Sequence, residues 1–243
     1  MRHGDSETRK PGDEAAREQG AGRSPLLPSA SPPDPAGGRW PVAGGLSAII
    51  RGRRSVRRFH PEPVAHTMLL EILEAARWAP SPHGRMPWRF AVLTEAAPKE
   101  RLAAAMGAAW RRQLAFDGQD AATIERRARA SHARITGAPA LIVPCLYLAD
   151  LDMYPDEARN AAEATMAIQS LGCAVQNMLL TAYAMGLDSG WMCAPLFCPE
   201  IVAGALGLAP GLTPHALITI GYAAADPARR ERLPLEDLVV LWE

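Results

Sequence analysis

The densest concentration of chemically capable side chains is a run of arginines around one serine. Five arginines fall within eight residues, at positions 51, 53, 54, 57 and 58, on both sides of Ser55. Adjacent guanidinium groups repel one another unless an anion or carboxylates receive them. A guanidinium binds a phosphate through two parallel hydrogen bonds, and a serine hydroxyl adds a further donor. The run therefore predicts a phosphate-binding segment, and a solvent-exposed charged stretch is the alternative interpretation.

Three further segments contain residues that could contribute to the same site. A proline-rich loop over residues 79–90 contains Ser81 and His83. The segment over residues 190–195 places a tryptophan and a cysteine ahead of a proline. A second basic group near the C-terminus consists of Arg229, Arg230 and Arg232. Two basic groups that lie far apart in the sequence could therefore fold together around one anionic ligand.

Taken in this order, the four segments resemble the FMN-dependent nitroreductase family. Members of that family begin with an Arg-x-Ser-x-basic-x-Phe motif, which corresponds here to residues 53–59. They continue with a loop that ends in Pro-Trp-x-Phe, here residues 87–90, and close with a basic-x-Arg-x-Pro motif, here residues 230–234. The resemblance covers residues 46–243. It implies an α+β fold with a mostly antiparallel sheet flanked by helices, and a long buried helix at the interface of a homodimer.

The resemblance also implies roles for individual residues. The FMN phosphate is assigned to residues of both basic groups, namely Arg53, Ser55, Arg230 and Arg232, and Arg54 is also expected to bind the cofactor. Arg57 would face the N1/O2 edge of the flavin, where a cation stabilises the reduced, anionic ring. Ser81 would lie at the other edge. A backbone N–H from Met192, Cys193 or Ala194 would donate a hydrogen bond to flavin N5.

Three residues are predicted to contact the substrate: His83, Arg112 and Trp191. The alternatives are a solvent-facing loop for His83, a solvated helix face for Arg112 and core packing for Trp191. The resemblance implies that the flavin carries the hydride in a ping-pong cycle, with NADH or NADPH as donor, so no catalytic side chain is predicted. Within the family, residues 191–199 are most similar to the C-terminal flavin domain of FbiB, which reduces a dehydro precursor of coenzyme F-420. The substrate is therefore expected to be such a precursor or, alternatively, a general nitro or quinone acceptor.

The pattern of apolar residues predicts the elements that must position these groups. Helices are expected near residues 46–52, 68–76, 99–116, 121–135 and 199–206, and strands near residues 90–93, 140–148, 189–193 and 216–220. A longer helix over residues 160–185 is apolar nearly all round, and residues 164–187 include no charged side chain. Amides in its middle, such as Gln176 and Asn177, argue against a membrane span. This helix should therefore be covered by its own domain or by a second subunit.

The composition narrows the classes of protein further. Lys plus Arg and Asp plus Glu number 26 each, so nothing indicates a nucleic-acid partner, and nucleic-acid binding by the arginine run is the weakest alternative. The four cysteines lack CxxC spacing, so no metal site is predicted and reduced thiols in a cytoplasmic protein fit best.

Two expectations about organisation complete the sequence analysis. Residues 1–45 are rich in Gly and Pro and predict a disordered tail ahead of one FMN-binding domain over residues 46–243. We expect an FMN-dependent oxidoreductase that does not associate with a membrane. A flavin-binding protein without turnover stays open beside it, because phosphate capture alone would also use both basic groups.

Overall fold

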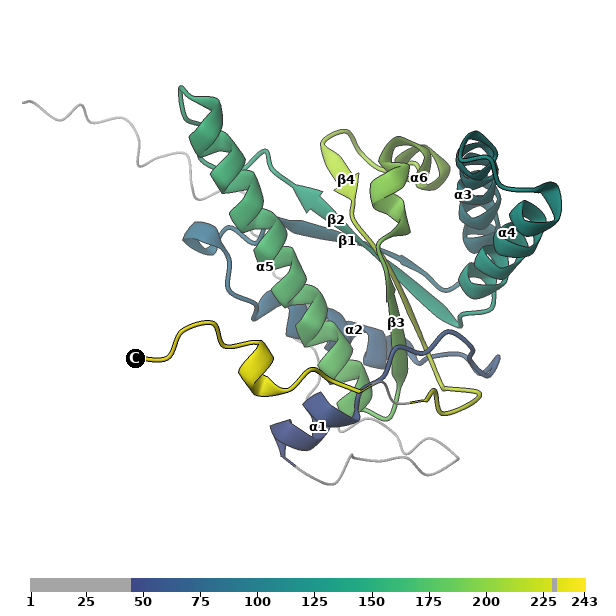
Figure 1. Cartoon of the computed structure of the whole chain (residues 1–243), viewed down its shortest axis with the longest axis horizontal. Helices are drawn as coiled ribbons and strands as arrows, with labels where there is room; N and C mark the ends of the chain where they lie inside the picture. Colours follow the sequence, from purple (N-terminus) through teal and green to yellow (C-terminus); the bar gives the residue numbers. More distant parts are fainter. Residues whose placement is uncertain (1–44, 229–230) are drawn as a thin grey trace, which may run out of the picture. The chain divides into compact units, whose positions relative to one another are not determined.

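A computed structural model describes residues 45–228 and 231–243 (Figure 1). The helices in these ranges are α1 (Leu46–Gly52), α2 (His66–Arg77), α3 (Ala96–Phe116), α4 (Ala121–Thr136), α5 (Glu157–Ala184) and α6 (Pro199–Leu206). The strands are β1 (Trp88–Leu93), β2 (Ala140–Tyr147), β3 (Asp188–Met192), β4 (Leu212–Pro214) and β5 (Leu217–Gly221). Three short 3-10 turns are η1 (Pro82–Gly84), η2 (Ala194–Phe197) and η3 (Leu235–Asp237). Except for Gly45, the predicted tail lies outside the described residues.

The strands form one antiparallel sheet in the order β1, β2, β5, β3, and β4 pairs with β2. Strand β2 lies in its interior, where Ile142 is opposite Val92 of β1 and Ile218 of β5. Every residue of β2 except Tyr147 is buried, which its continuous apolar run requires of a strand covered on both faces. The predicted α+β class with an antiparallel sheet is confirmed.

Alternate residues of the central strands face two separate hydrophobic cores. Ile142 and Ile218 pack with side chains of α2 and α5, whereas Leu141, Val143 and Leu217 pack with side chains of α3 and α6. This alternation follows from the two-residue period of a strand. In Figure 1 the strands accordingly separate α2 and α5 from α3, α4 and α6. The sheet is thus the middle one of three layers, and β3 is one of its two edge strands.

Helix α5 is the longest element, with 28 residues, and extends about 42 Å. It begins where the Asp156 carboxylate accepts a hydrogen bond from the backbone N–H of Arg159, and it ends before Gly186, which has a φ of 81°. One side of the helix is buried against α2 and the sheet. The other side is exposed in this chain and contains Thr165, Met166, Ile168, Gln169, Cys173 and Gln176.

The expectation that this helix is covered all round is therefore not met by one chain alone. The exposed strip is uncharged, as the sequence requires of residues 164–187. None of the helices in the described ranges is long and apolar enough to cross a membrane. Of the two expected ways to cover this helix, a second subunit is the one that the exposed strip leaves open.

Candidate cofactor-binding site

Helix α1 delivers the arginine run to the C-terminal end of α5. Gly52 lies against the ring of Tyr183, and a Cβ atom at Gly52 would come within 2.5 Å of that ring. The guanidinium of Arg54 donates hydrogen bonds to the carbonyl oxygens of Arg51 and Arg53, both at 2.7 Å. These contacts satisfy carbonyl groups at the end of a short helix. They hold the backbone at Arg53 in place.

The residues after Arg53 run along the edge of the sheet. Ser55 forms a parallel bridge with Ser189 of β3, and the backbone N–H of Val56 donates to the carbonyl oxygen of Ser189 at 2.9 Å. Val56 is buried. Since side chains alternate along an extended segment, Arg53, Ser55 and Arg57 share the side opposite Val56. The Arg-x-Ser-x-Arg spacing thus places three potential phosphate or flavin contacts on one side.

Gly190 allows this segment to approach the sheet. A Cβ atom at Gly190 would lie 2.4 Å from the carbonyl oxygen of Val56 and 2.8 Å from Oγ1 of Thr219. Farther along, the N–H of His60 donates to the carbonyl oxygen of Tyr222 at 2.8 Å. The arginine segment is therefore attached to the scaffold at both of its ends.

The two basic groups meet at Arg53. The pKa of Arg53 lies below its ordinary value, first because burial penalises the charged form, and then because the positive charges of Arg232 and Arg54 are close. Arg230 and Arg229 lie outside the described residues. The convergence of like charges at Arg53 creates a place that favours an anion.

Strand β3 connects this basic end with the predicted flavin N5 donors. Ser189 lies beside Ser55, and four residues later the strand has ended and Cys193 follows, about 13 Å away along an extended chain. Cys193 and Ala194 are exposed, and Met192 is half-buried. The hydroxyl oxygen of Ser189 is buried and has no hydrogen-bond partner among the described residues. Strand β3 therefore positions both the arginine segment and residues 192–194, which carry the predicted N–H donors.

Of the three predicted substrate contacts, Trp191 lies on the strand that leads to Cys193, and Arg112 is adjacent in sequence to a residue that contacts η2. Trp191 belongs to β3 and is 40% exposed, so its ring is not simply core filling. Arg112 is exposed on α3, next to Gln113, whose side-chain amide donates to the carbonyl oxygen of Phe197 in η2 at 3.1 Å. The preceding residue, Arg111, is instead paired with Glu125 of α4 at 2.8 Å.

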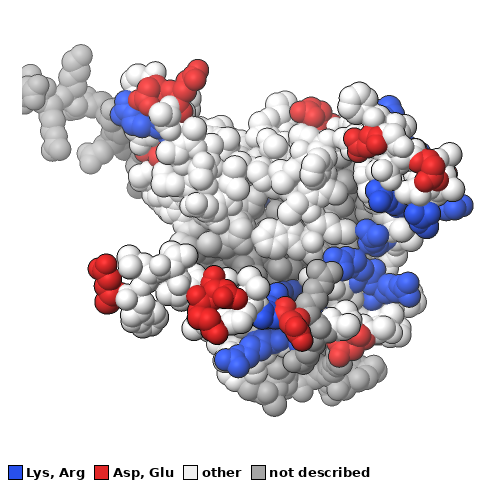
Figure 2. All heavy atoms as spheres, viewed as in Figure 1, with Lys and Arg blue, Asp and Glu red and all other residues white. Residues whose placement is uncertain are grey.

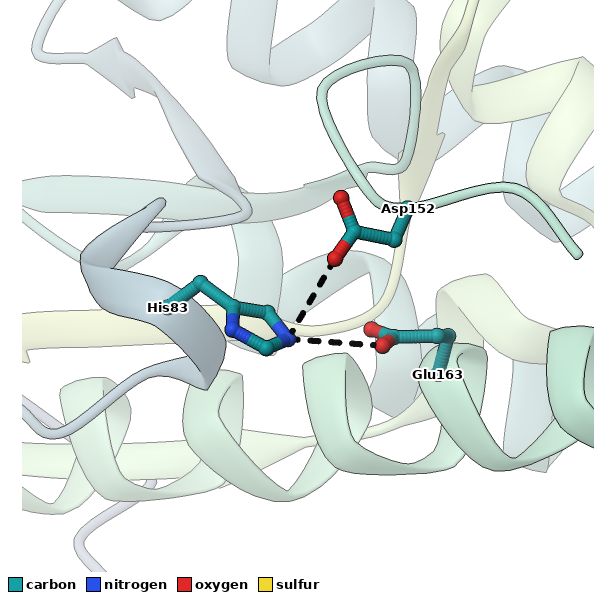
Figure 3. Close-up of side chains that lie close together, drawn as sticks. All are labelled: His83, Asp152 and Glu163. Atoms are coloured by element: carbon teal, nitrogen blue, oxygen red, sulfur yellow. Dashed lines mark ion pairs between the residues drawn. The ribbon is translucent and has the colours of Figure 1, made fainter. Parts of the chain in front are cut away.

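Ser81 and His83 lie at the opposite end of α5. The Ser81 hydroxyl accepts a hydrogen bond from the N–H of Met86 at 3.0 Å, and His83 and Met86 have φ angles of 51° and 49°, in the left-handed region. Nε2 of His83 lies 3.5 Å from Oε1 of Glu163, near the start of α5 (Figure 3). Glu163 and Tyr183, which mark the two ends, are separated by about 30 Å along the helix. One chain therefore does not bring Ser81 or His83 to Arg53.

The sequence alone does not predict the residues that lie next to the arginine segment and next to His83. Arg57 and Arg58 line a cavity of about 630 Å³ together with Arg134 of α4. Figure 2 shows Lys and Arg side chains, with some Asp and Glu side chains among them, along the lower and right-hand parts of the visible face, and an uncharged area over the middle of α5. Arg134, and the carboxylates Asp152 and Glu163 near His83, belong to no motif. No signal in the sequence alone connects them with their partners.

The chain is similar in sequence to proteins of one known family. The Nitroreductase family profile matches residues 50–222. The chain is 34% identical over 228 residues to the NADH dehydrogenase of Thermus thermophilus, covering 83% of this chain and 97% of that protein. It is 28% identical over 192 residues to the NAD(P)H nitroreductase YfhC of Bacillus subtilis, covering 79% and 91%.

A solved structure supports the same assignment. The crystal structure of a nitroreductase from Desulfovibrio desulfuricans in complex with FMN is similar, with a TM-score of 0.64 and 28% sequence identity. The similarity covers 82% of this chain and 98% of that one. The predicted nitroreductase-like fold is confirmed, and the chain belongs to the nitroreductase family.

Proposed function

We propose that this protein is an FMN-dependent oxidoreductase that takes a hydride from NADH or NADPH. The observation that carries the proposal is the convergence of Arg53 and Arg232 near Ser55, which pairs with Ser189 of β3, the strand that leads directly to Cys193. Relatives support it by name, because one is described with FMN, one as an NADH dehydrogenase and one as an NAD(P)H nitroreductase.

The proposed binding roles follow from the positions of the side chains. Arg53, Ser55 and Arg232 would hold the phosphate, together with Arg230. Arg54 is left out of this group because its guanidinium donates to backbone carbonyls of α1. The N–H of Cys193 or Ala194 would donate to flavin N5, and β3 sets the separation between that donor and the phosphate.

Bound FMN supplies hydride acceptance and donation, and the side chains of this protein orient and stabilise it. Arg57 would place a positive charge at the ring edge and favour the reduced, anionic form. Trp191 would form part of the wall against which the donor and the acceptor lie in turn. The scheme needs no side chain as a general acid.

The distance between the two ends of α5 leads to the second part of the proposal, a homodimer. One FMN cannot contact both Arg53 and Ser81 of the same chain across about 30 Å. If the exposed strip of α5 packs against a second copy in the opposite direction, Ser81 of the partner subunit approaches Arg53. The strip suits such an interface because it is uncharged, and the C-terminal residues Leu233, Leu235, Leu238, Val240, Leu241 and Trp242 add exposed apolar surface.

Cysteine labelling tests the homodimer. Cys173 is exposed on the α5 strip of the single chain, so it is expected to react with iodoacetamide at least about tenfold more slowly in the native protein than after denaturation. Mass spectrometry after timed labelling measures the rate for each thiol. Sedimentation velocity in the same buffer measures the mass of the particle.

The other cysteines serve as internal controls. Cys145 and Cys198 are buried and should stay unlabelled in the native state, and burial raises the pKa of Cys145 to about 11. Cys193 lies outside the α5 strip, so in the FMN-free protein it should react quickly. A monomeric particle whose Cys173 reacts as fast as Cys193 would contradict the proposed interface.

For the acceptor, we propose a polyanionic deazaflavin, such as a dehydro precursor of coenzyme F-420. The supporting observation is the cavity that Arg57, Arg58 and Arg134 line, since three guanidinium groups favour an anionic ligand over a neutral one. A nitro compound or a quinone is the alternative acceptor, which the name of the Bacillus subtilis relative favours.

Anaerobic reduction followed by reoxidation tests the whole proposal. The purified protein is expected to be yellow, to bleach with NADH or NADPH, and to regain its colour with an acceptor. Arg134→Ala should lower kcat/KM for the deazaflavin about tenfold or more, because a charged hydrogen bond contributes about 1.5–3 kcal/mol, and should leave a neutral nitro acceptor unaffected. Bleaching without reoxidation by any acceptor would indicate a flavin-binding protein without turnover. A colourless protein that takes up no FMN would refute the assignment.

A further inference from the structure

The N-terminal end of α5 brings together one imidazole and two carboxylates from three separate segments. His83 comes from η1, Asp152 from the loop after β2, and Glu163 from α5 (Figure 3). One donor atom of each residue lies within 4.8 Å of the donor atoms of the other two. We propose that these three side chains bind a divalent transition-metal ion, and that the ion is Zn²⁺.

The separations suit an ion between the side chains better than direct hydrogen bonds. Nε2 of His83 lies 3.6 Å from Oδ2 of Asp152 and 3.5 Å from Oε1 of Glu163. An N–H···O hydrogen bond is shorter, at about 2.9 Å. Tetrahedral zinc binds nitrogen and oxygen at about 2.0–2.2 Å, which places neighbouring ligand atoms about 3.4 Å apart. The two distances from the imidazole therefore match the edges of a zinc tetrahedron.

Glu163 provides evidence that does not depend on these distances. Its side chain is 5% exposed, and Oε2 has no hydrogen-bond partner among the described residues. In Figure 3 its carboxylate points toward the imidazole of His83. A buried carboxylate whose charge is incompletely paired is costly, and coordination of a cation by this carboxylate offsets that cost.

Neighbouring side chains orient both carboxylates. Arg85 donates to Oδ1 of Asp152 at 2.5 Å, which leaves Oδ2 facing His83. The hydroxyl of Tyr154 donates to Oε1 of Glu163 at 3.3 Å. Metal ligands commonly have such outer partners, which hold them in place.

Charge and ligand type indicate the class of ion. With a neutral imidazole, two carboxylates and the guanidinium of Arg85 give a net charge of −1, which attracts a dication. A nitrogen ligand favours first-row transition metals over Mg²⁺ and Ca²⁺, which prefer oxygen. Asp152 is 38% exposed, so solvent can reach the cluster and a water molecule can supply the fourth ligand. The ion would fasten the loop that contains Ser81 to the first turns of α5.

Zinc affinity of the full-length, FMN-containing protein tests this proposal. The protein is treated with EDTA, dialysed, and titrated with Zn²⁺ in competition with a chromophoric chelator. His83→Gln, Asp152→Asn and Glu163→Gln are each expected to weaken the tightest zinc site at least about tenfold. Excess Mg²⁺ should not compete, and Co²⁺ should give visible absorption bands that His83→Gln abolishes.

His132→Gln is the matched control. Nε2 of His132 lies 2.8 Å from Oε1 of Glu100, so this is a second histidine–carboxylate pair, but it belongs to no three-residue cluster in the described ranges. Its zinc affinity should equal that of the unchanged protein. Asp152→Asn alters an exposed loop residue and keeps the test valid if Glu163→Gln fails to fold. Equal zinc affinity in all variants, or absence of zinc binding, would overturn the proposal. Neither outcome would affect the proposed binding of FMN.

Discussion

Replacement of Arg53 by alanine is expected to weaken FMN binding about 10- to 150-fold, and Arg232→Ala should have a similar effect. Each change removes hydrogen bonds to a charged phosphate, which contribute about 1.5–3 kcal/mol. The two guanidinium groups come from opposite ends of the domain, and each lies close enough to the other for the charge of Arg232 to lower the pKa of Arg53. Titration of the FMN-free protein, followed by flavin fluorescence, measures both dissociation constants.

Arg51→Ala is the control for loss of charge alone. Arg51 belongs to the same run and is exposed, but it lies one helical residue before the end of α1 and outside the Arg-x-Ser-x-Arg motif. Its replacement should change FMN affinity by less than about threefold, the scale of an exposed charge. The FMN-free Arg53→Ala protein should be no less stable than the parent, because the change relieves repulsion from Arg54 and Arg232. Equal losses of FMN affinity in Arg51→Ala and Arg53→Ala would show that the arginines attract FMN by their overall positive charge and that Arg53 does not contact the phosphate.

Gly190→Ala is expected to lower the free energy of unfolding by about 1–3 kcal/mol and to abolish FMN retention. The added methyl group would lie 2.4 Å from the carbonyl oxygen of Val56, so the segment with Ser55 must move away from β3. That movement breaks the hydrogen bond from Val56 to Ser189 and displaces the phosphate contacts. Urea unfolding and the flavin content after gel filtration measure the two losses.

Gly204→Ala tests the same substitution where space is available. Gly204 lies inside α6, and a Cβ atom there meets no heavy atom within 4 Å. Alanine should stabilise the protein by about 0.5–1 kcal/mol, because it restricts the unfolded chain. If Gly190→Ala proves as stable as the parent and keeps its flavin, the arginine segment is not held against β3 as described.

The sequence predicts the elements well where periodicity is long or continuous. The apolar run at residues 140–148 becomes β2, and the expected helices at residues 121–135 and 199–206 become α4 and α6 with nearly the same ends. Strand β4 has three residues and was not predicted, because so short a segment has no period to recognise. Lys99 was likewise not recognised as a buried residue whose ammonium donates to the carbonyl oxygens of Ala138 and Pro139.

The candidate site is predictable only in part. Motif spacing predicts that Arg53, Ser55 and Arg232 belong to one site, and the charge of Arg232 does lie close to Arg53. Spacing could not show that Arg54 is engaged with the backbone, since this depends on where α1 ends. It also could not show that Ser81 lies far from Arg53, because a linear motif order contains no information about the length of the helix between them.

The length of helix α5 sets the separation between the two parts of the proposed cofactor site. Its two ends hold the arginine segment and the Ser81 loop, so adding or removing one residue within it would turn one end relative to the other by about 100° and shift it by about 1.5 Å. The hairpin of α3 and α4 lies on the other face of the sheet, and its turn at Gly118 has free space around it. Changes of length are therefore tolerable in that hairpin and disruptive in α5. Under the proposed function, remodelling of α3 and α4 would change the acceptor preference without altering the residues assigned to the flavin.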